Sequence, residues 1–367
     1  MDNAYVGQAN YALNLLRTIR TDAQSVVLSP FAVTAVFGIA YFGAGETTRS
    51  EMLDFFANGS SGEDFEKFLT REIAAVANGS TGYTLNIANR LYYKKDFVMK
   101  ESFLNAVKSK FNGQLEAADF ANGLDTAEKI NKWVEGKTNS KITQLVTADM
   151  FDALTRLMIV GAVYFKGNWA SKFSAEETKE QTFYVSEGRE VQVEMMHKVD
   201  NFDYYADEDV QVVGIPYNGD DVEMFIILPK ERFGLEALLK TTDGDRLLKF
   251  FHHIRRSKLN VYIPKFKMEK ELQLSDALSL LGLRSVFTNE ADFSNMTDES
   301  VYISRVIHKA CIEVNEQGTE AAAAAALTMT RTIRPSGNIP PAVFLADHPF
   351  MFAVVKNDNI LFIGEYY

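Results

Sequence analysis

The side chains that could carry out chemistry in this chain are few and scattered. His252 and His253 are the only adjacent histidines. Neighbouring side chains on a helix or strand point in different directions, so this pair makes a weak metal site. Cys311 is the only cysteine, which rules out an internal disulfide. The Gly-x-Ser-x-Gly, His-Glu-x-x-His, phosphate-loop and Gly-x-Gly-x-x-Gly motifs are all missing. We therefore expect no enzyme activity, no metal site and no cofactor.

A long alanine-rich segment is the most unusual feature of the sequence. It runs from Glu316 through six alanines, Ala321 to Ala326, to Pro341, and a compact domain seldom carries so long a connection without a function for it. A surface helix followed by a turn is one interpretation, because alanine is the best helix former. If the segment is extended, one face carries only small side chains, those of Thr319, Ala321, Ala323 and Ala325. Such a strand could enter a sheet between two existing strands without a steric clash, because no proline or charge stands at these positions.

The elements that must position this segment change character along the chain. Apolar spacing and capping residues predict helices over 4–19, 30–42, 63–76, 100–111 and 127–135, and another that Thr48 and Glu51 open in capping-box spacing. Period-two alternation and buried apolar runs predict strands over 83–93, 157–165, 301–314, 350–355 and 360–363. Asn218-Gly219 predicts a hairpin between strands at 210–217 and 222–228. Helices first and hairpin-linked strands later indicate the α+β class.

Composition favours one soluble globular domain, residues 1–367. Of the residues, 47% are hydrophobic and 24% are charged, and no linker rich in Pro, Gly, Ser or charge divides the chain. The net charge of -11 is spread along the sequence, which disfavours nucleic acid as a partner. The apolar run 26–45 is long enough to span a membrane, but Ser29-Pro30 inside it begins a helix, so we expect a short strand and a buried helix instead.

Two features bear on location in the cell. The single cysteine requires no oxidising compartment, and the first residues show no basic region followed by an apolar run. We therefore expect a cytoplasmic protein. An extracellular one is the alternative if a signal peptide has been removed.

The alanine-rich segment and seven further blocks resemble the serpin family. The run from Glu316 to Ala326 closely resembles the hinge of the exposed reactive loop in inhibitory serpins. The other blocks match the family in order and spacing across the whole chain: Leu28-Ser29-Pro30, Phe42 to Thr47, Tyr164 to Trp169, Ile263 to Phe266, Ala291 to Ser294, Ile307 to Ala310 and Ala346 to Phe350. The chain is most similar in type to the intracellular serpins that lack a signal peptide.

The resemblance implies a fold and a mechanism. The fold is a single α+β domain with a large mixed sheet, two further sheets and about eight or nine helices, and an exposed reactive-centre loop near 316–342. The mechanism is suicide inhibition of a serine protease or, as a second target class, a cysteine protease. The protease cuts the loop and becomes joined to it as an acyl-enzyme. The cleaved loop then inserts into the large sheet and distorts the protease, whose deacylation depends on closely placed groups.

The resemblance also places the bond that the protease attacks. Counting from Glu316, as in the family, gives Arg331-Thr332 or Thr332-Ile333. We prefer Arg331-Thr332, because arginine suits the primary pocket of a trypsin-like protease. The hinge is assigned to Glu316, Gly318, Thr319, Glu320, Ala321, Ala322, Ala323, Ala324 and Ala325. A plain surface loop with solvated arginines is the other interpretation.

Five residues match positions that control opening of the large sheet in the family. Glu316 and Lys265 match an ion pair above Trp169, at the end of the sheet where insertion begins. Ser29 and His308 match the shutter, where the central strands separate. At the shutter this sequence departs from the family, because Ala32 stands in place of a serine and Gly161 in place of an asparagine. We expect His308 to lack its usual partners and the uncleaved fold to insert its loop or polymerise more easily.

A non-inhibitory serpin, acting as a carrier, chaperone or storage protein, is the alternative function. The small, proline-free hinge disfavours it. The acidic residues of 62–77 disfavour activation by heparin. We expect a monomer whose partner is a trypsin-like protease and which binds neither nucleic acid nor a membrane.

Overall fold

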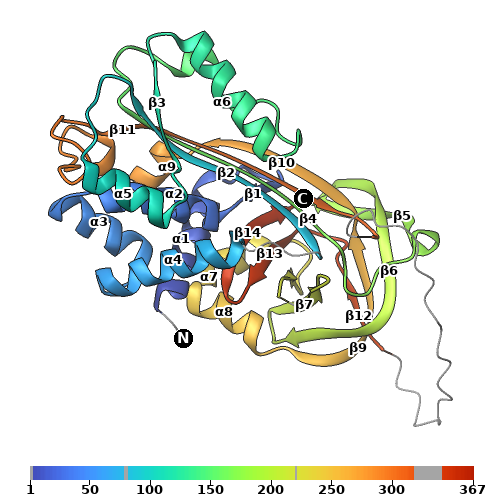
Figure 1. Cartoon of the computed structure of the whole chain (residues 1–367). Coiled ribbons are helices and arrows are strands. Elements are labelled where there is room, and N and C mark those ends of the chain that lie inside the picture. The colour runs from blue at the N-terminus through green and yellow to red at the C-terminus, as the bar shows by residue number, and fades with distance from the viewer. Residues whose placement is uncertain (1–2, 78–81, 220, 318–340) are drawn as a thin grey trace.

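The computed structural model describes residues 3–77, 82–219, 221–317 and 341–367. Figure 1 shows two layers of strands, with most helices of the first half below the long strands and α6 above them. The described residues form nine α-helices: α1 Asn3–Ile19, α2 Pro30–Gly43, α3 Glu46–Ala57, α4 Gly62–Ala77, α5 Glu101–Lys110, α6 Gly123–Lys137, α7 Leu235–Thr241, α8 Gly244–His252 and α9 Ser275–Leu280. The predicted α+β class is confirmed.

One sheet has five strands of mixed direction, in the order β10-β11-β4-β2-β3. Its strands are β2 Tyr83–Lys94, β3 Leu115–Ala118, β4 Leu157–Gly167, β10 Phe266–Gln273 and β11 Ile303–Val314. β4 and β11 run parallel, whereas β2 pairs with β4 and β10 with β11 in the antiparallel sense. The strands predicted at 83–93, 157–165 and 301–314 are therefore confirmed as the middle of this sheet.

The second sheet has nine strands. They are β1 Val26–Leu28, β5 Lys179–Ser186, β6 Arg189–Ala206, β7 Val210–Pro216, β8 Glu223–Pro229, β9 Arg255–Pro264, β12 Ala342–Leu345, β13 Phe350–Lys356 and β14 Asn359–Tyr366. The Asn218-Gly219 hairpin is confirmed between β7 and β8, which pair in an antiparallel register. The sequence predicted two further sheets, whereas the structure has one continuous sheet in their place. The 18-residue β6 joins them, because it pairs with β5, β7 and β9.

The core fills the space between the layers. Inner-face side chains such as Val163, Ala310 and Ile312 of the five-stranded sheet pack against Ile226 and Phe352 of the nine-stranded one. On the opposite face of the five-stranded sheet, α6 covers a separate apolar cluster. Both faces of β4 and β11 are therefore covered for much of their length.

The apolar run at 26–45 folds as predicted, into a short strand and a buried helix. Ser29 caps α2, because its Oγ accepts the backbone N–H of Ala32 at 3.1 Å, and Pro30 occupies the first turn. All but one of the α2 residues are buried, and α2 packs on β2, β4 and β14. Among the described residues, no helix has the length and apolar content that a membrane crossing requires.

The predicted capping box at Thr48 and Glu51 is wrong. α3 begins at Glu46 after Gly45, so both residues lie inside the helix. Their side chains instead hold a neighbouring segment: Thr48 Oγ1 accepts the Asp292 N–H at 2.8 Å, and the Glu51 carboxylate accepts the Ser285 N–H at 2.9 Å. A contact with residues about 240 positions away replaces the local cap.

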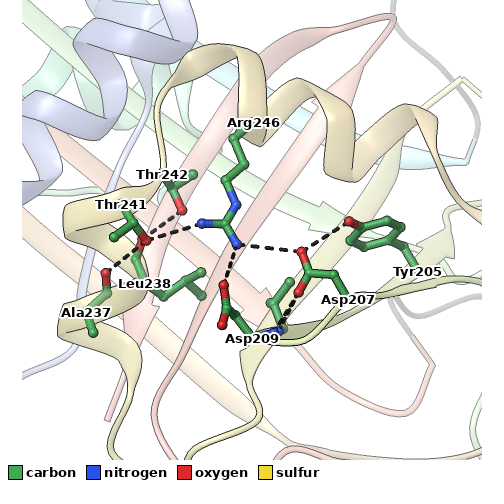
Figure 2. Close-up of polar contacts among 9 residues, drawn as sticks. Tyr205, Asp207, Asp209, Ala237, Leu238, Thr241, Thr242 and Arg246 are labelled. Atoms are coloured by element: carbon green, nitrogen blue, oxygen red, sulfur yellow. Dashed lines mark hydrogen bonds and ion pairs between the residues drawn. The ribbon is translucent and has the colours of Figure 1, made fainter.

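A charged contact fixes α8 against the sheet, as Figure 2 shows. The Arg246 guanidinium lies 3.6 Å from Asp207 and 3.2 Å from Asp209, both in the turn between β6 and β7, and it also donates to Thr241 Oγ1 at 3.2 Å. Asp207 in turn accepts the backbone N–H groups of residues 209 and 210. This network lies far from the predicted loop in the sequence and has a structural role.

Candidate functional site

The central feature of the five-stranded sheet is the direct pairing of β4 with β11. The parallel register runs from Leu157 opposite Ile303 to Lys166 opposite Glu313. Within the described part of the chain, no strand lies between them. β11 ends at Val314 and β12 begins at Ala342 in the other sheet, so the chain between them leaves one sheet and enters the other.

The predicted ion pair lies at the end of β11. Lys265, between β9 and β10, places its Nζ 3.5 Å from Glu316 Oε1, and Glu194 of β6 lies at the same distance on its other side. Burial would raise the pKa of Glu316, but its own backbone N–H and the Lys265 ammonium outweigh burial, so the pKa lies below its usual value. The lysine is thus shared between two carboxylates. Because Lys265 and Glu194 stay accessible to solvent, the ion pairs stabilise the fold by only about 1 kcal/mol or less.

Trp169 holds the same end of β11 through its indole N–H. The side chain is 2% exposed, and Nε1 donates to the Asn315 carbonyl at 2.7 Å. The ring stacks on Tyr217, with centroids 4.4 Å apart and planes 11° apart. The Phe173 N–H donates to the Glu316 carbonyl at 2.9 Å. Two hydrogen bonds therefore fasten the two residues that follow β11.

At the middle of the sheet, two polar side chains attach the strands to the start of α2. The Ser29 N–H donates a hydrogen bond of 3.0 Å to Nε2 of His308 on β11. Asn89 of β2 donates from Nδ2 to the Ala32 carbonyl at 3.1 Å. Burial lowers the pKa of His308 to about 4, although the Gly161 backbone opposes part of this effect. The imidazole is therefore neutral at physiological pH.

The two departures from the family pattern have different outcomes. Ala32 makes two hydrogen bonds through its backbone: its carbonyl accepts from Asn89 Nδ2, and its N–H donates to Ser29 Oγ. Gly161 lies between Asn89 and His308 in the register of the three strands. His308 keeps one partner, the backbone of Ser29, and its Nδ1 has none in bonding geometry among the described residues.

Several predicted residues lie outside the described residues. These are the hinge positions Gly318, Thr319, Glu320, Ala321, Ala322, Ala323, Ala324 and Ala325, and the candidate bonds formed by Arg331, Thr332 and Ile333. Their roles stay predictions. The two adjacent histidines lie within the described residues, and their side chains contact different partners. His252 Nε2 lies 2.6 Å from Asp358 Oδ1, and His253 Nδ1 lies 3.0 Å from the Lys249 carbonyl. Within the described ranges, no three His, Cys, Asp or Glu side chains gather so as to hold a metal ion.

Comparison with known proteins decides the family. The family model described as serpin (serine protease inhibitor) matches residues 6–367. The chain belongs to the serpin family. Neuroserpin of Gallus gallus is 35% identical to this serpin over 365 residues, covering 96% of this chain and 88% of that protein. Human serpin B4 is 33% identical over 395 residues, covering 100% of this chain and 99% of its own length.

The solved structure of uncleaved ovalbumin superposes on this serpin with a TM-score of 0.87, at 25% identity and with 99% of each chain covered. The serpin fold predicted from the sequence blocks is thereby confirmed. The family is mostly composed of protease inhibitors, and it also includes non-inhibitory members such as ovalbumin and thyroxine-binding globulin.

Two residues of this site were not predicted. Asn89 interrupts an alternating apolar face formed by Leu85, Ile87 and Leu91, and a polar residue in such a pattern is a usable signal for a buried hydrogen bond. Glu194 gave no signal, because its position beside Lys265 depends on the pairing of β6 with β9.

Proposed function

We propose that this serpin is a suicide-substrate inhibitor of trypsin-like serine proteases. The observation that carries the proposal is the direct parallel pairing of β4 and β11, followed at once by a segment whose alternate residues are all small. A cleaved segment of that composition can become a middle strand, with about 1 kcal/mol gained for each new hydrogen bond. About a dozen such bonds rival the stability of a whole domain. The uncleaved state is then kinetically trapped.

The ends of the proposed loop suit this mechanism. The backbone carbonyls of Asn315 and Glu316 each accept one hydrogen bond, from Trp169 and Phe173 respectively, and these contacts lie where the first inserted residues would pass. Opening the sheet requires β4 and β11 to separate along their shared register. Because the loop joins β11 to β12 in the other sheet, cutting it frees one end to move.

We propose Arg331-Thr332 as the bond attacked, with Thr332-Ile333 as the alternative. Arginine before the bond selects proteases whose primary pocket carries an acidic residue. A cysteine protease with the same preference is the second target class. The lone, buried Cys311 suits a reducing compartment, and we propose a cytoplasmic site of action, with an extracellular one as the alternative.

Incubation with trypsin, followed by a denaturing gel, tests the proposal. An inhibitor leaves a covalent band near the summed mass of both proteins, and mass spectrometry of the released peptide identifies the bond. Cleavage should also raise the midpoint of guanidinium unfolding. A clipped chain with no covalent band and an unchanged midpoint would refute the proposal and favour the non-inhibitory alternative, a carrier, chaperone or storage protein.

A pair of hinge variants separates insertion from loop cleavage. Ala323→Arg puts a charge on the small face, and burying that charge costs several kcal/mol. This variant should still be cleaved, but as a plain substrate without a covalent band. Glu320→Arg is the matched control, because residue 320 lies on the opposite face of an extended strand, and it should keep the covalent band.

A further inference from the structure

Three neighbouring strands place Asn89, Gly161 and His308 in one row. Gly161 of β4 is the register partner of Asn89 on β2 and of His308 on β11. Residues paired across neighbouring strands share a face of the sheet, so the two polar side chains flank a residue that has none. Both are deeply buried, at 8% exposure for Asn89 and 1% for His308.

The start of α2 fixes which atom of each side chain donates and which accepts. His308 Nε2 accepts the Ser29 N–H, so the proton of the neutral ring is on Nδ1, which is a donor. Asn89 Nδ2 donates to the Ala32 carbonyl, so its Oδ1 is an acceptor. Neither Nδ1 of His308 nor Oδ1 of Asn89 has a partner in good hydrogen-bonding geometry among the described residues, although the Gly161 backbone lies near enough to His308 to raise its pKa a little.

These two unpartnered atoms face the same small space over Gly161. A Cβ built on Gly161 would lie 3.2 Å from Asn89 Oδ1 and 3.5 Å from His308 Nδ1, and the next atom is the Ile307 carbonyl oxygen at 4.0 Å. The space is thus bounded by one donor and two acceptors. A buried donor or acceptor left unpaired costs about 1–3 kcal/mol, so a molecule that can both donate and accept is strongly favoured there.

We propose that the Asn89–Gly161–His308 row binds one water molecule, which links β2 to β11 across the face of β4. The water accepts from His308 Nδ1–H and donates to Asn89 Oδ1, and its second proton points towards the Ile307 carbonyl. A cavity of about 410 Å³ lined by Phe31, Ala35, Ile87 and Asn89 lies beside the Asn89 end of the row, on the side of α2 and β2. Polar surroundings with two to four partners are what an internal water requires.

The same water distinguishes the uncleaved from the cleaved state, a step that rests on the proposed function. A strand inserted between β4 and β11 moves His308 from about 5 Å to about 10 Å from Gly161, two strand spacings instead of one. One water cannot then reach both atoms. The bridge therefore stabilises the uncleaved sheet alone and holds β11 in place until the sheet opens.

A crystal structure of the uncleaved protein tests the site directly. We expect a water peak within about 3.2 Å of both Asn89 Oδ1 and His308 Nδ1. A direct hydrogen bond between the two side chains, or no solvent peak over Gly161, would overturn the proposal. This result does not depend on inhibition, so it is distinguishable from failure of the proposed function.

A pair of glycine variants tests the effect on sheet opening. Gly161→Ala fills the space with a methyl group and displaces the water. Heat-driven polymerisation of the uncleaved form should become about fivefold faster, as expected for the loss of one net hydrogen bond. The guanidinium midpoint of the uncleaved form should fall relative to that of the cleaved form, because the contact of the methyl group with Asn89 is common to both forms and cancels in the difference between them. Gly136→Ala on α6, where nothing lies within 4 Å of the added methyl group, is the matched control. The better helix propensity of alanine should raise the midpoints of both forms by a similar amount, and polymerisation should not become faster. An equal change in the cleaved and uncleaved forms, or no change in either, would refute the role in opening.

Discussion

Replacing Trp169 by phenylalanine should loosen the end of β11 where insertion is proposed to begin. Phenylalanine keeps an aromatic ring against Tyr217 but loses the indole N–H that donates to the Asn315 carbonyl at 2.7 Å. Asn315 is only partly buried, so loss of that hydrogen bond costs about 1 kcal/mol. The smaller ring leaves apolar surface uncovered at a site that is 2% exposed, which costs about 1 kcal/mol more. We expect Trp169→Phe to lower the free energy of unfolding by about 2 kcal/mol.

Guanidinium unfolding followed by far-ultraviolet circular dichroism measures this change. The chain has two tryptophans, so each tryptophan variant would lose a fluorescence probe, whereas the dichroism signal is common to all variants. Unfolding rates add a second measurement. Because the bond fastens a strand end, its loss should speed unfolding and spontaneous loop insertion more than it slows refolding.

Trp133→Phe is the control for the ring itself. Trp133 lies on α6 beneath the Arg90 guanidinium, 4.0 Å from the ring centroid, and its Nε1 has no hydrogen-bond partner among the described residues. Phenylalanine keeps an aromatic face for Arg90, so we expect a loss of less than about 1 kcal/mol. If Trp169→Phe cost no more than Trp133→Phe, the bond to Asn315 would have no stabilising role and the reasoning would be refuted.

Three further predictions concern specificity, pH and burial. Arg331→Leu should abolish the covalent band with trypsin and create one with chymotrypsin, as scored by denaturing gels; an unchanged trypsin band would exclude Arg331 as the specificity residue. Burial, reinforced by the Asp203 charge and opposed by Arg256, raises the pKa of the Glu223 carboxyl from 4.5 to about 7, so the folded chain keeps this proton over a pH range in which the unfolded chain has lost it. The contribution of this group to the free energy of unfolding therefore falls as the pH rises from 4.5 to 7. Between pH 5 and pH 8, urea unfolding should show a loss of stability in the unsubstituted protein that is on the order of 1–3 kcal/mol larger than in Glu223→Gln. Equal losses in the two proteins would count against the prediction. Burial also raises the pKa of the Cys311 thiol to about 11, so a thiol reagent should label the folded chain at least about 100 times more slowly than the unfolded chain, and similar rates would show that β11 is not covered.

The sequence was sufficient where a local signal and the tertiary structure agree. Ser29-Pro30 predicted the start of α2, and the observed cap is the hydrogen bond that such a pair makes. Period-two alternation predicted β2 and β11, and a continuous apolar run predicted β4, which is covered on both faces. Resemblance to the serpin family then placed Lys265 near Glu316, which no periodicity indicates, and the structure puts the two side chains 3.5 Å apart.

Other features depend on contacts between distant parts of the chain. Thr48 and Glu51 have capping-box spacing, but they accept hydrogen bonds from the backbones of Asp292 and Ser285. A local sequence pattern carries no information on contacts between such distant residues. β6 was not predicted, because its polar residues are spread over both faces and no clear period two results. The joining of two expected sheets through this strand follows from its length and could not be predicted from the resemblance.

The pairing of β1 with β14 has a consequence for synthesis on the ribosome. Val26 is the register partner of Glu365, and α2, which follows β1, also packs on β14. Nearly all of this helix is apolar and buried in the folded protein, yet the strand that covers it emerges more than 300 residues later. At about 5–20 residues per second, the nascent chain therefore exposes this apolar segment for many seconds during translation. A chaperone at the exit of the ribosomal tunnel would bind the chain at this segment.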